Sequence, residues 1–384
     1  MLPKSSPSLI QSPFLKLAIA WLVVILFLWK GSVWLSQPMT VGIAIACFAA
    51  LFGTILLGSF GVVREADHLA HELGEPYGTL ILTLSIVSIE VILIAAVMLG
   101  PSEAPTIARD SIFAVMMIIM NLVTGLCLVA GALRHGEQEY NTQGALAFIS
   151  MTLVLAGVAL IVPNTLTTGN GTFWPSQAIA IALLTAALYG TFLALQMGRY
   201  RAHFMQPPAG EMSIRRETAD ALGAASPSQT GSNRRKLLVH TVLLVALMVP
   251  IVLLAHDLAI VIDYGVAVAG APVAVGGVLI AIIVFTPESI TAVKAALNNE
   301  TQRAINLCLG AFVSTVGLTV PAVLAVGLLT GKTVVFGISA TETVLFGLTV
   351  GLTAMTYLGR RTSITQGLLH LMVFAVFAVM LFTN

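Results

Sequence analysis

Long apolar runs separated by short polar segments make up most of this chain. Each run is about as long as the roughly 20 residues that an α-helix needs to cross the hydrocarbon core of a bilayer. The pattern therefore predicts an all-α polytopic membrane protein with eleven transmembrane helices. They are expected over residues 14–35, 40–63, 77–100, 111–133, 144–163, 176–197, 237–256, 270–297, 304–329, 341–358 and 364–383.

The composition agrees with a chain that is surrounded by lipid. Hydrophobic residues make up 58% of it and charged residues 9%, whereas a soluble domain carries about 25% charged residues. The lipid bilayer is thus the expected partner. The net charge of +1 argues against nucleic-acid binding, which needs a basic surface. Cys47, Cys127 and Cys308 lie in apolar runs without CxxC spacing, so we expect small core residues.

Lysine and arginine indicate the topology. A cytoplasmic N-terminus places 15 of the 18 basic residues in cytoplasmic segments, in agreement with the positive-inside rule. Only Lys30, Arg109 and Lys332 then fall on the other side. After eleven crossings the C-terminus is expected to be periplasmic.

A polar segment near the middle of the chain divides the apolar runs. Residues 198–236 contain Pro207-Pro208 and the basic cluster Arg234-Arg235-Lys236, and this composition predicts a flexible cytoplasmic linker. We therefore expect four parts. They are an N-terminal segment with the first helix (1–36), a five-helix unit (37–197), the linker (198–236) and a second five-helix unit (237–384).

The two five-helix units share a weak internal repeat. Gly78 precedes Glu90 by twelve residues in the third predicted helix, and Gly276 precedes Glu288 by the same twelve in the eighth. A turn signal lies before each helix, at 74–76 and at 270–272. Since the helices are five spans apart, they cross the membrane in opposite senses, as in transporters with inverted repeats.

Glu90 and Glu288 are the strongest candidates for function. A charge deep in the membrane costs at least a few kcal/mol, so each needs a reason to be there. Pro287 lacks an amide proton and frees a backbone carbonyl beside Glu288, and such hard oxygens are ligands of Ca²⁺. The alternatives are a protonated, hydrogen-bonded Glu90 and an ordinary proline kink with a structural Glu288.

A pair of carboxylates has a chemistry that neither has alone. Two negative charges balance one divalent cation; without the cation they repel each other and lose solvation, which favours proton uptake. Competition between a metal ion and protons for the same oxygens is the basis of antiport. Additional oxygen ligands would come from polar neighbours, each equally suited to a helix–helix hydrogen bond. They are Ser85, Ser88, Asn121, Thr124, Thr286, Ser289, Ser314 and Thr315.

Three other polar residues are candidates for gating or a pH response. Glu342 opens the tenth span and would guide cations or cap the helix. Lys294 lies near the inner end of the eighth span, where it would snorkel to the cytoplasm. His370 lies in the last span and titrates in the physiological range, but it would also suit a packing role.

Catalytic motifs are missing from the sequence. It contains no glycine-rich phosphate loop, HExxH or GxSxG, which argues against an ATPase or an intramembrane hydrolase. We expect a protein that is not an enzyme and needs no cofactor. A receptor or scaffold without transport is a remote alternative, because burying carboxylates costs free energy and would serve no purpose in such a protein.

Several stretches resemble the ChaA-type bacterial calcium/proton antiporters of the cation/calcium exchanger superfamily. They are Ala66–Leu82 in the first unit, and Pro287–Ala304, Leu318–Pro321 and Gly359–Thr362 in the second. The resemblance implies one extra first helix, two inverted five-helix repeats, and a bacterial inner-membrane antiporter that exports Ca²⁺ in exchange for H⁺. It also implies one essential acidic residue in each repeat, Glu90 and Glu288.

The sequence departs from that family at one point. Many calcium/proton exchangers carry Gly-Asn ahead of each acidic residue, where this chain has Ile86-Val87 and Val284-Phe285. Fewer side-chain oxygens would then surround the ion. Na⁺/H⁺ or K⁺/H⁺ exchange by the same fold is therefore the alternative.

Overall fold

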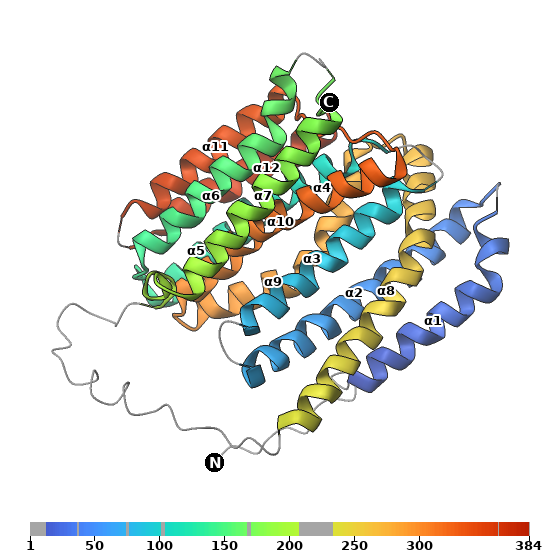
Figure 1. The fold of residues 1–384 in the computed structure, drawn as a ribbon, viewed down its shortest axis with the longest axis horizontal. Helices are drawn as coiled ribbons and strands as arrows, with labels where there is room; N and C mark the ends of the chain where they lie inside the picture. Colours follow the sequence, from blue (N-terminus) through green and yellow to red (C-terminus); the bar gives the residue numbers. More distant parts are fainter. Residues whose placement is uncertain are drawn as a thin grey trace.

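The computed structural model describes residues 13–36, 38–73, 77–100, 104–166, 170–206, 233–359 and 361–383. In this part of the chain eleven helical spans form one bundle (Figure 1), which confirms the predicted all-α fold and the number of spans. The spans are α1 (Pro13–Trp34), α2 (Val41–Leu73), α3 (Tyr77–Met98), the rod of α4 (Ile107–Met116), η2 (Met117–Val123) and α5 (Thr124–His135), α6 (Thr142–Leu160), α7 (Pro175–Met197), α8 (Asn233–Ala269), α9 (Ala274–Leu297), α10 (Thr301–Thr330), α11 (Ala340–Tyr357) and α12 (Ile364–Leu381).

Most of these helices are long and apolar enough to cross a membrane. Among the described residues nine meet both criteria of length and hydropathy. The other two are α3, in which Thr83–Met98 is apolar, and α11, which has eighteen residues and Glu342 in its first turn. Outward-facing side chains such as Leu28 and Leu183 are exposed, as expected where lipid is the solvent. The chain is therefore a multi-pass membrane protein.

The helices pack in three groups. On one side of the bundle α2 packs along α8, with α1 against both (Figure 1). The central group consists of α3, α9, α10 and the α4–η2–α5 rod, and this rod is the most deeply buried of the candidate spans. The third group, α6, α7, α11 and α12, lies on the other side. Consequently α3 and α9, which carry the two glutamates, lie in the interior.

The contacts between helices are reciprocal. Helix α3 packs against α10 while α9 packs against α4 and α5, and α7 packs against α10 while α12 packs against α5 and η2. Two structurally related sets of five helices, α2–α7 and α8–α12, produce this arrangement. The C-termini of α5, α7, α9 and α11 lie at one end of the bundle. We call it the linker end, because α7 ends and α8 begins there. Helix α3 starts at the linker end and α9 finishes there, so they run in opposite directions.

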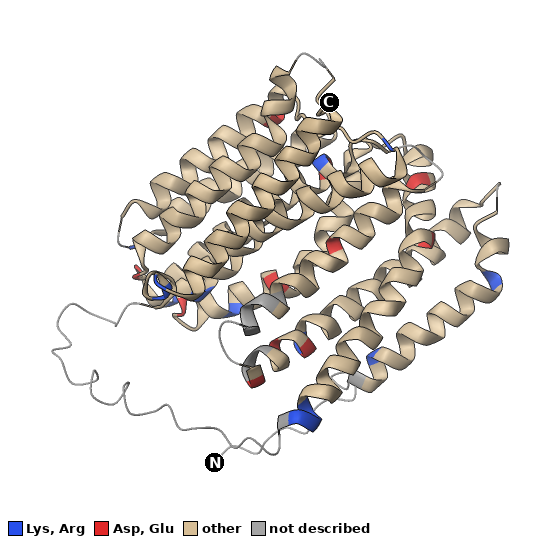
Figure 2. Cartoon of the chain, viewed as in Figure 1, with Lys and Arg blue, Asp and Glu red and all other residues tan. Residues whose placement is uncertain are grey.

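Basic residues are distributed unequally between the two ends. In the described part of the chain only Lys30, Arg109 and Lys332 lie near the end opposite the linker, and the other Lys and Arg residues gather toward the linker end (Figure 2). This is the asymmetry on which the predicted topology depends.

Helix boundaries differ from the predicted runs where polar residues continue a helix. Helix α8 begins at Asn233, inside the predicted linker 198–236, and α2 extends ten residues beyond its apolar run to Leu73. Both extensions are charged, so hydropathy does not detect them. The predicted turn at 270–272 is confirmed by Gly270, whose φ of +59° ends α8. Residues 207–232, the turn at 74–76 and Arg360 lie outside the described residues.

Three prolines and one π-helical segment interrupt the helices of the described region. Pro250, Pro287 and Pro321 lie inside α8, α9 and α10. The π-helical segment η2 connects α4 to α5. A proline leaves the carbonyl four residues earlier without its helical partner, and π-segments often occur at functional sites. The interruptions in α9 and η2 lie close to the candidate site in the bundle interior.

Candidate ion and proton binding site

Glu90 lies in the middle of α3 and is completely buried. It is thirteen residues from Tyr77, which corresponds to roughly 20 Å along the helix. Its Oε2 accepts a hydrogen bond of 3.0 Å from Thr319 Oγ1 on α10. Its Oε1 has no hydrogen-bond partner among the residues that the structure describes. One oxygen of this carboxyl group is therefore held in place and the other is free for a ligand.

Glu288 occupies the corresponding place on α9. Its side chain is buried, and within the described part of the chain Oε2 has no hydrogen-bond partner. The Glu90 carboxyl group lies within electrostatic range of Glu288. Within the described residues neither forms an ion pair. The structure thus brings together the two residues that the sequence singled out.

Backbone carbonyls add to the oxygens near Glu288. Because Pro287 has no amide proton, the carbonyl of Ile283 loses its helical hydrogen bond. Ile283 is completely buried, so this carbonyl is shielded from lipid and water. It lies a little more than one turn before Glu288 on the same helix.

The predicted hydroxyl ligands fall into two groups. Most of them donate a hydrogen bond to a carbonyl in the preceding turn, at 2.5–2.9 Å. Their oxygens keep lone pairs that can accept a hydrogen bond or bind a cation. They are Ser85, Ser88, Thr124, Thr286, Ser289 and Ser314.

Thr315 forms the second group, because its hydroxyl does not donate to a carbonyl of the preceding turn. Its Oγ1 is completely buried and lies beside the Glu90 carboxyl group, but it forms no hydrogen bond of normal geometry with any described residue. It lies one turn before Thr319 on α10, so it faces the same side as the residue that binds Glu90. A buried oxygen without a partner costs about 1–3 kcal/mol. Thr315, Glu90 and Glu288 share this property, and a proton or a cation would satisfy all three.

Asn121 and His370 belong to a separate hydrogen-bonded chain. Asn121, in η2, donates through Nδ2 to Thr349 Oγ1 at 2.9 Å, and its Oδ1 lies 3.2 Å from His370 Nδ1. The other ring nitrogen of His370 lies 3.1 Å from Thr356 Oγ1. Both polar ends of the Asn121 amide are thus engaged by α11 and α12. Of the two roles considered for His370, this geometry matches the packing role.

The other two gating candidates, Glu342 and Lys294, lie in surroundings that are typical of structural residues. Glu342 forms a capping box with Ser339, accepting a hydrogen bond from its backbone amide at 2.8 Å. Lys294 lies exposed in the last turn of α9. Both lie near helix ends, away from the middle of α3 and α9.

Two residues near the site were not anticipated from the sequence. Thr319 lies in the Leu318–Pro321 stretch, which was noted only for its resemblance. Tyr189 on α7 is buried, its hydroxyl lies near those of Ser314 and Thr83, and it is within the field of Glu288. Its ring also packs directly on Gly317, where a Cβ would come within 2.5 Å of a ring carbon. A single tyrosine in an apolar run gives no signal of such a position.

Comparison with known proteins agrees with this arrangement. Residues 43–198 match the family model described as sodium/calcium exchanger protein. The chain is 35% identical over 360 residues to the sodium-potassium/proton antiporter ChaA of Escherichia coli, covering 94% of this chain and 93% of that one. The chain belongs to the cation/calcium exchanger superfamily. It is accordingly a membrane transporter of cations.

Solved structures share the fold of this exchanger. The structure of native YfkE superimposes with a TM-score of 0.72 at 16% identity, covering 97% of this chain and all of that one. The H⁺/Ca²⁺ exchanger CAX gives a TM-score of 0.65 at 12% identity, with 96% and 89% covered. These likenesses confirm the fold of two inverted five-helix repeats preceded by one helix.

Proposed function

We propose that this exchanger is a secondary active antiporter that binds either a cation or protons at Glu90 and Glu288. One observation carries the proposal: two buried carboxyl groups lie within electrostatic range of each other on oppositely directed helices, and each keeps an oxygen without a hydrogen-bond partner among the described residues. Two buried negative charges are energetically unfavourable when no ligand is bound between them. Protons neutralise it in one state and a cation neutralises it in the other.

Transport follows if the site opens to one side of the membrane at a time. In transporters built from inverted repeats the ion binds near the midplane, and one part rocks against the other. Here the units would be residues 37–197 and 237–384, preceded by segment 1–36 and joined by linker 198–236. We assign the linker end to the cytoplasm of a bacterial inner membrane, with the C-terminus in the periplasm, because the basic residues gather at the linker end. The proton gradient would then drive export of the cation.

Calcium is the first candidate for the exported ion. Two carboxylates balance its charge, and Ca²⁺ takes six to eight oxygen ligands. The freed Ile283 carbonyl and the Thr315 hydroxyl would supply two of them, and the serine and threonine hydroxyls near the carboxylates would supply others.

Sodium or potassium is the second candidate, with two observations in its favour. The positions ahead of the glutamates hold Ile86, Val87, Val284 and Phe285, which are all buried and add no side-chain oxygen. The similar protein from Escherichia coli is named a sodium-potassium/proton antiporter. A site with fewer oxygens is less selective for a divalent ion such as Ca²⁺, which takes six to eight oxygen ligands.

Proton flux in everted membrane vesicles tests the proposal. Ca²⁺, Na⁺, K⁺ and Mg²⁺ are added separately, and we expect a response to at least Ca²⁺ or Na⁺. Glu90→Gln and Glu288→Gln should each abolish it. Glu300→Gln is the matched control, because this glutamate is exposed and pairs with Arg303 at 2.9 Å. Folded protein that responds to none of the four cations would favour a receptor or scaffold instead, and wild-type rates in a single glutamine variant would remove that glutamate from the mechanism.

A further inference from the structure

A line of polar residues runs along one face of α10. Thr301, Cys308, Thr315 and Thr319 are spaced by seven, seven and four residues, and these intervals return to the same side of a helix. Thr319 binds Glu90, and Thr301 opens the helix at the linker end. The line is therefore roughly 27 Å long and connects the carboxylate site with one surface of the bundle.

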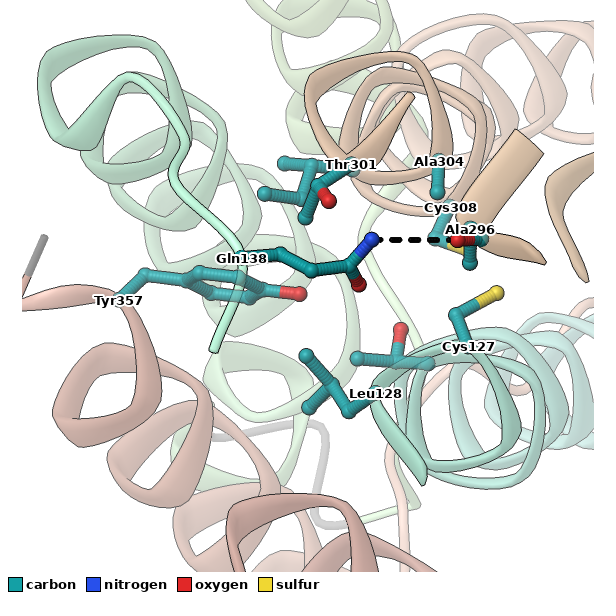
Figure 3. A pocket seen from close by; sticks show the side chains of 10 residues that line it. Cys127, Leu128, Gln138, Ala296, Thr301, Ala304, Cys308 and Tyr357 are labelled. Carbon is teal, nitrogen blue, oxygen red and sulfur yellow. Dashed lines mark hydrogen bonds between the residues drawn. The ribbon is translucent and has the colours of Figure 1, made fainter. Parts of the chain in front are cut away.

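A small cavity of about 10 Å³ lies on this face near the linker end, which is about the space that one water molecule needs. Figure 3 shows Gln138 reaching across it, and its Nε2 donates to Ala296 O at 3.2 Å. Thr301 lines the cavity, and no described residue forms a hydrogen bond with its buried Oγ1. The lining of the cavity is mostly apolar, with Thr124, Gln138 and Thr301 as its polar members.

Two thiols from different helices meet at this cavity. Cys127 on α5 and Cys308 on α10 are both buried, neither is in a disulfide, and both line the cavity (Figure 3). The Cys308 thiol lies against the Cys127 thiol and the Thr124 hydroxyl, and it is within the field of the Glu288 carboxylate. Cys47 on α2, the remaining cysteine of the chain, does not line the cavity.

We propose that Cys127 and Cys308 form a two-thiol binding site for a soft metal cation on the passage between the linker end and Glu288. Soft cations prefer thiolate ligands, whereas Ca²⁺, Na⁺ and K⁺ prefer oxygen. Binding replaces two S–H bonds by two metal–sulfur bonds and releases two protons for each divalent ion, with no change of oxidation state. The Thr124 hydroxyl is placed to add an oxygen ligand.

An ion held by both thiols would close this passage and tie α5 to α10. These helices belong to different five-helix sets, so such a bridge would also oppose their relative movement. Inhibition of exchange by a soft metal rests on the proposed function, but binding of the metal does not. The two statements are therefore tested separately.

Mercuric ion titrated into the purified, reduced full-length chain tests the binding. A Cys47→Ser background leaves only the cavity pair, and thiol labelling after denaturation verifies that both cysteines are reduced. We expect one ion bound per chain, two protons released, and a mercury–thiolate absorbance band. Adding Cys127→Ser or Cys308→Ser should weaken binding, against a competing thiol chelator, by at least tenfold; the alanine variants replace any serine variant that does not fold. Two ions per chain, no binding, or equal affinity in the single-thiol variants would overturn the site.

Proton flux in proteoliposomes tests the effect on transport. One equivalent of mercuric ion should lower the flux of the Cys47→Ser chain at least tenfold, and a dithiol chelator should restore it. The rate of each single-thiol variant, relative to its own metal-free rate, should stay within about twofold at the same metal concentration. Binding to the pair without loss of flux would show that the site is not on the passage. Absence of flux in metal-free protein would instead contradict the proposed function and leave the binding result standing.

Discussion

Thr319 on α10 holds Glu90 on α3 through a hydrogen bond of 3.0 Å from Oγ1 to Oε2, across the interface between the two five-helix sets. The bond leaves Oε1 free and orients it. Because a hydroxyl that donates to a carboxylate stabilises its charged form, Thr319 should help a cation to compete with protons at this site.

Thr319→Val should therefore weaken binding of the cation more than binding of the proton. Loss of a hydrogen bond to a charged group costs about 1.5–3 kcal/mol, so we expect the apparent affinity for the driving cation to fall by about tenfold or more, and the flux to need a higher pH. The cation dependence of proton flux at several pH values measures this. Thr330→Val is the control, because its hydroxyl donates to Val326 O at the far end of α10. Equal affinities in Thr319→Val and Thr330→Val would contradict the assigned role.

The hydrogen-bonded chain around His370 predicts an effect on stability. His370→Leu would leave Asn121 Oδ1 and Thr356 Oγ1 without their partner, at about 1–3 kcal/mol for each buried group. We expect a melting temperature several degrees lower, and a pH profile of flux that keeps its shape. Leu368→Ala on the same helix, at an exposed position, should change the melting temperature little. A stable His370→Leu protein with a displaced pH profile would instead identify His370 as a pH sensor.

Gly277 lies where α9 packs closely against α4. A Cβ at this position would lie 2.6 Å from the Ser111 amide nitrogen and 2.7 Å from the Asp110 carbonyl carbon, and backbone atoms cannot give way. Gly277→Ala should therefore lower stability by about 1–3 kcal/mol and displace the helix that carries Glu288.

Gly53→Ala is the matched control for Gly277→Ala. Gly53 lies in α2, and a Cβ there would meet no atom within 4 Å. Alanine favours a helix over glycine by up to about 1 kcal/mol, so this variant should be neutral or more stable. Thermal unfolding of both variants in the same detergent measures the difference, and equal melting temperatures would show that the α4–α9 contact is not tight.

The sequence predicts the fold and the two acidic residues because both depend on a strong signal. An apolar run of membrane length has few alternatives to a transmembrane helix, and a lone carboxylate such as Glu90 is conspicuous in such a run. The equal spacing of Gly78–Glu90 and Gly276–Glu288 also identifies the pair without coordinates. These predictions require no knowledge of which helices touch.

Partners across the bundle could not be predicted in the same way. Asn121 bonds to Thr349 and His370, more than 200 residues away, and nothing in an apolar run indicates which hydroxyl it meets. The π-segment around Asn121 was likewise not predicted from the sequence. The Cys127–Cys308 contact is similar: each cysteine alone looks like a small core residue, and only the packing of α5 on α10 makes them a pair.

Proton release on cation binding tests the central claim most directly. The driving cation is added to the detergent-purified chain in weak buffer, and released protons and bound cation are counted together. Competition at Glu90 and Glu288 predicts up to about two protons for each divalent ion, with an affinity that rises by up to about 100-fold for each pH unit while both groups are protonated. Either glutamine variant should release at most one proton or bind no cation. Cation binding without proton release across pH 6–9 would contradict the account.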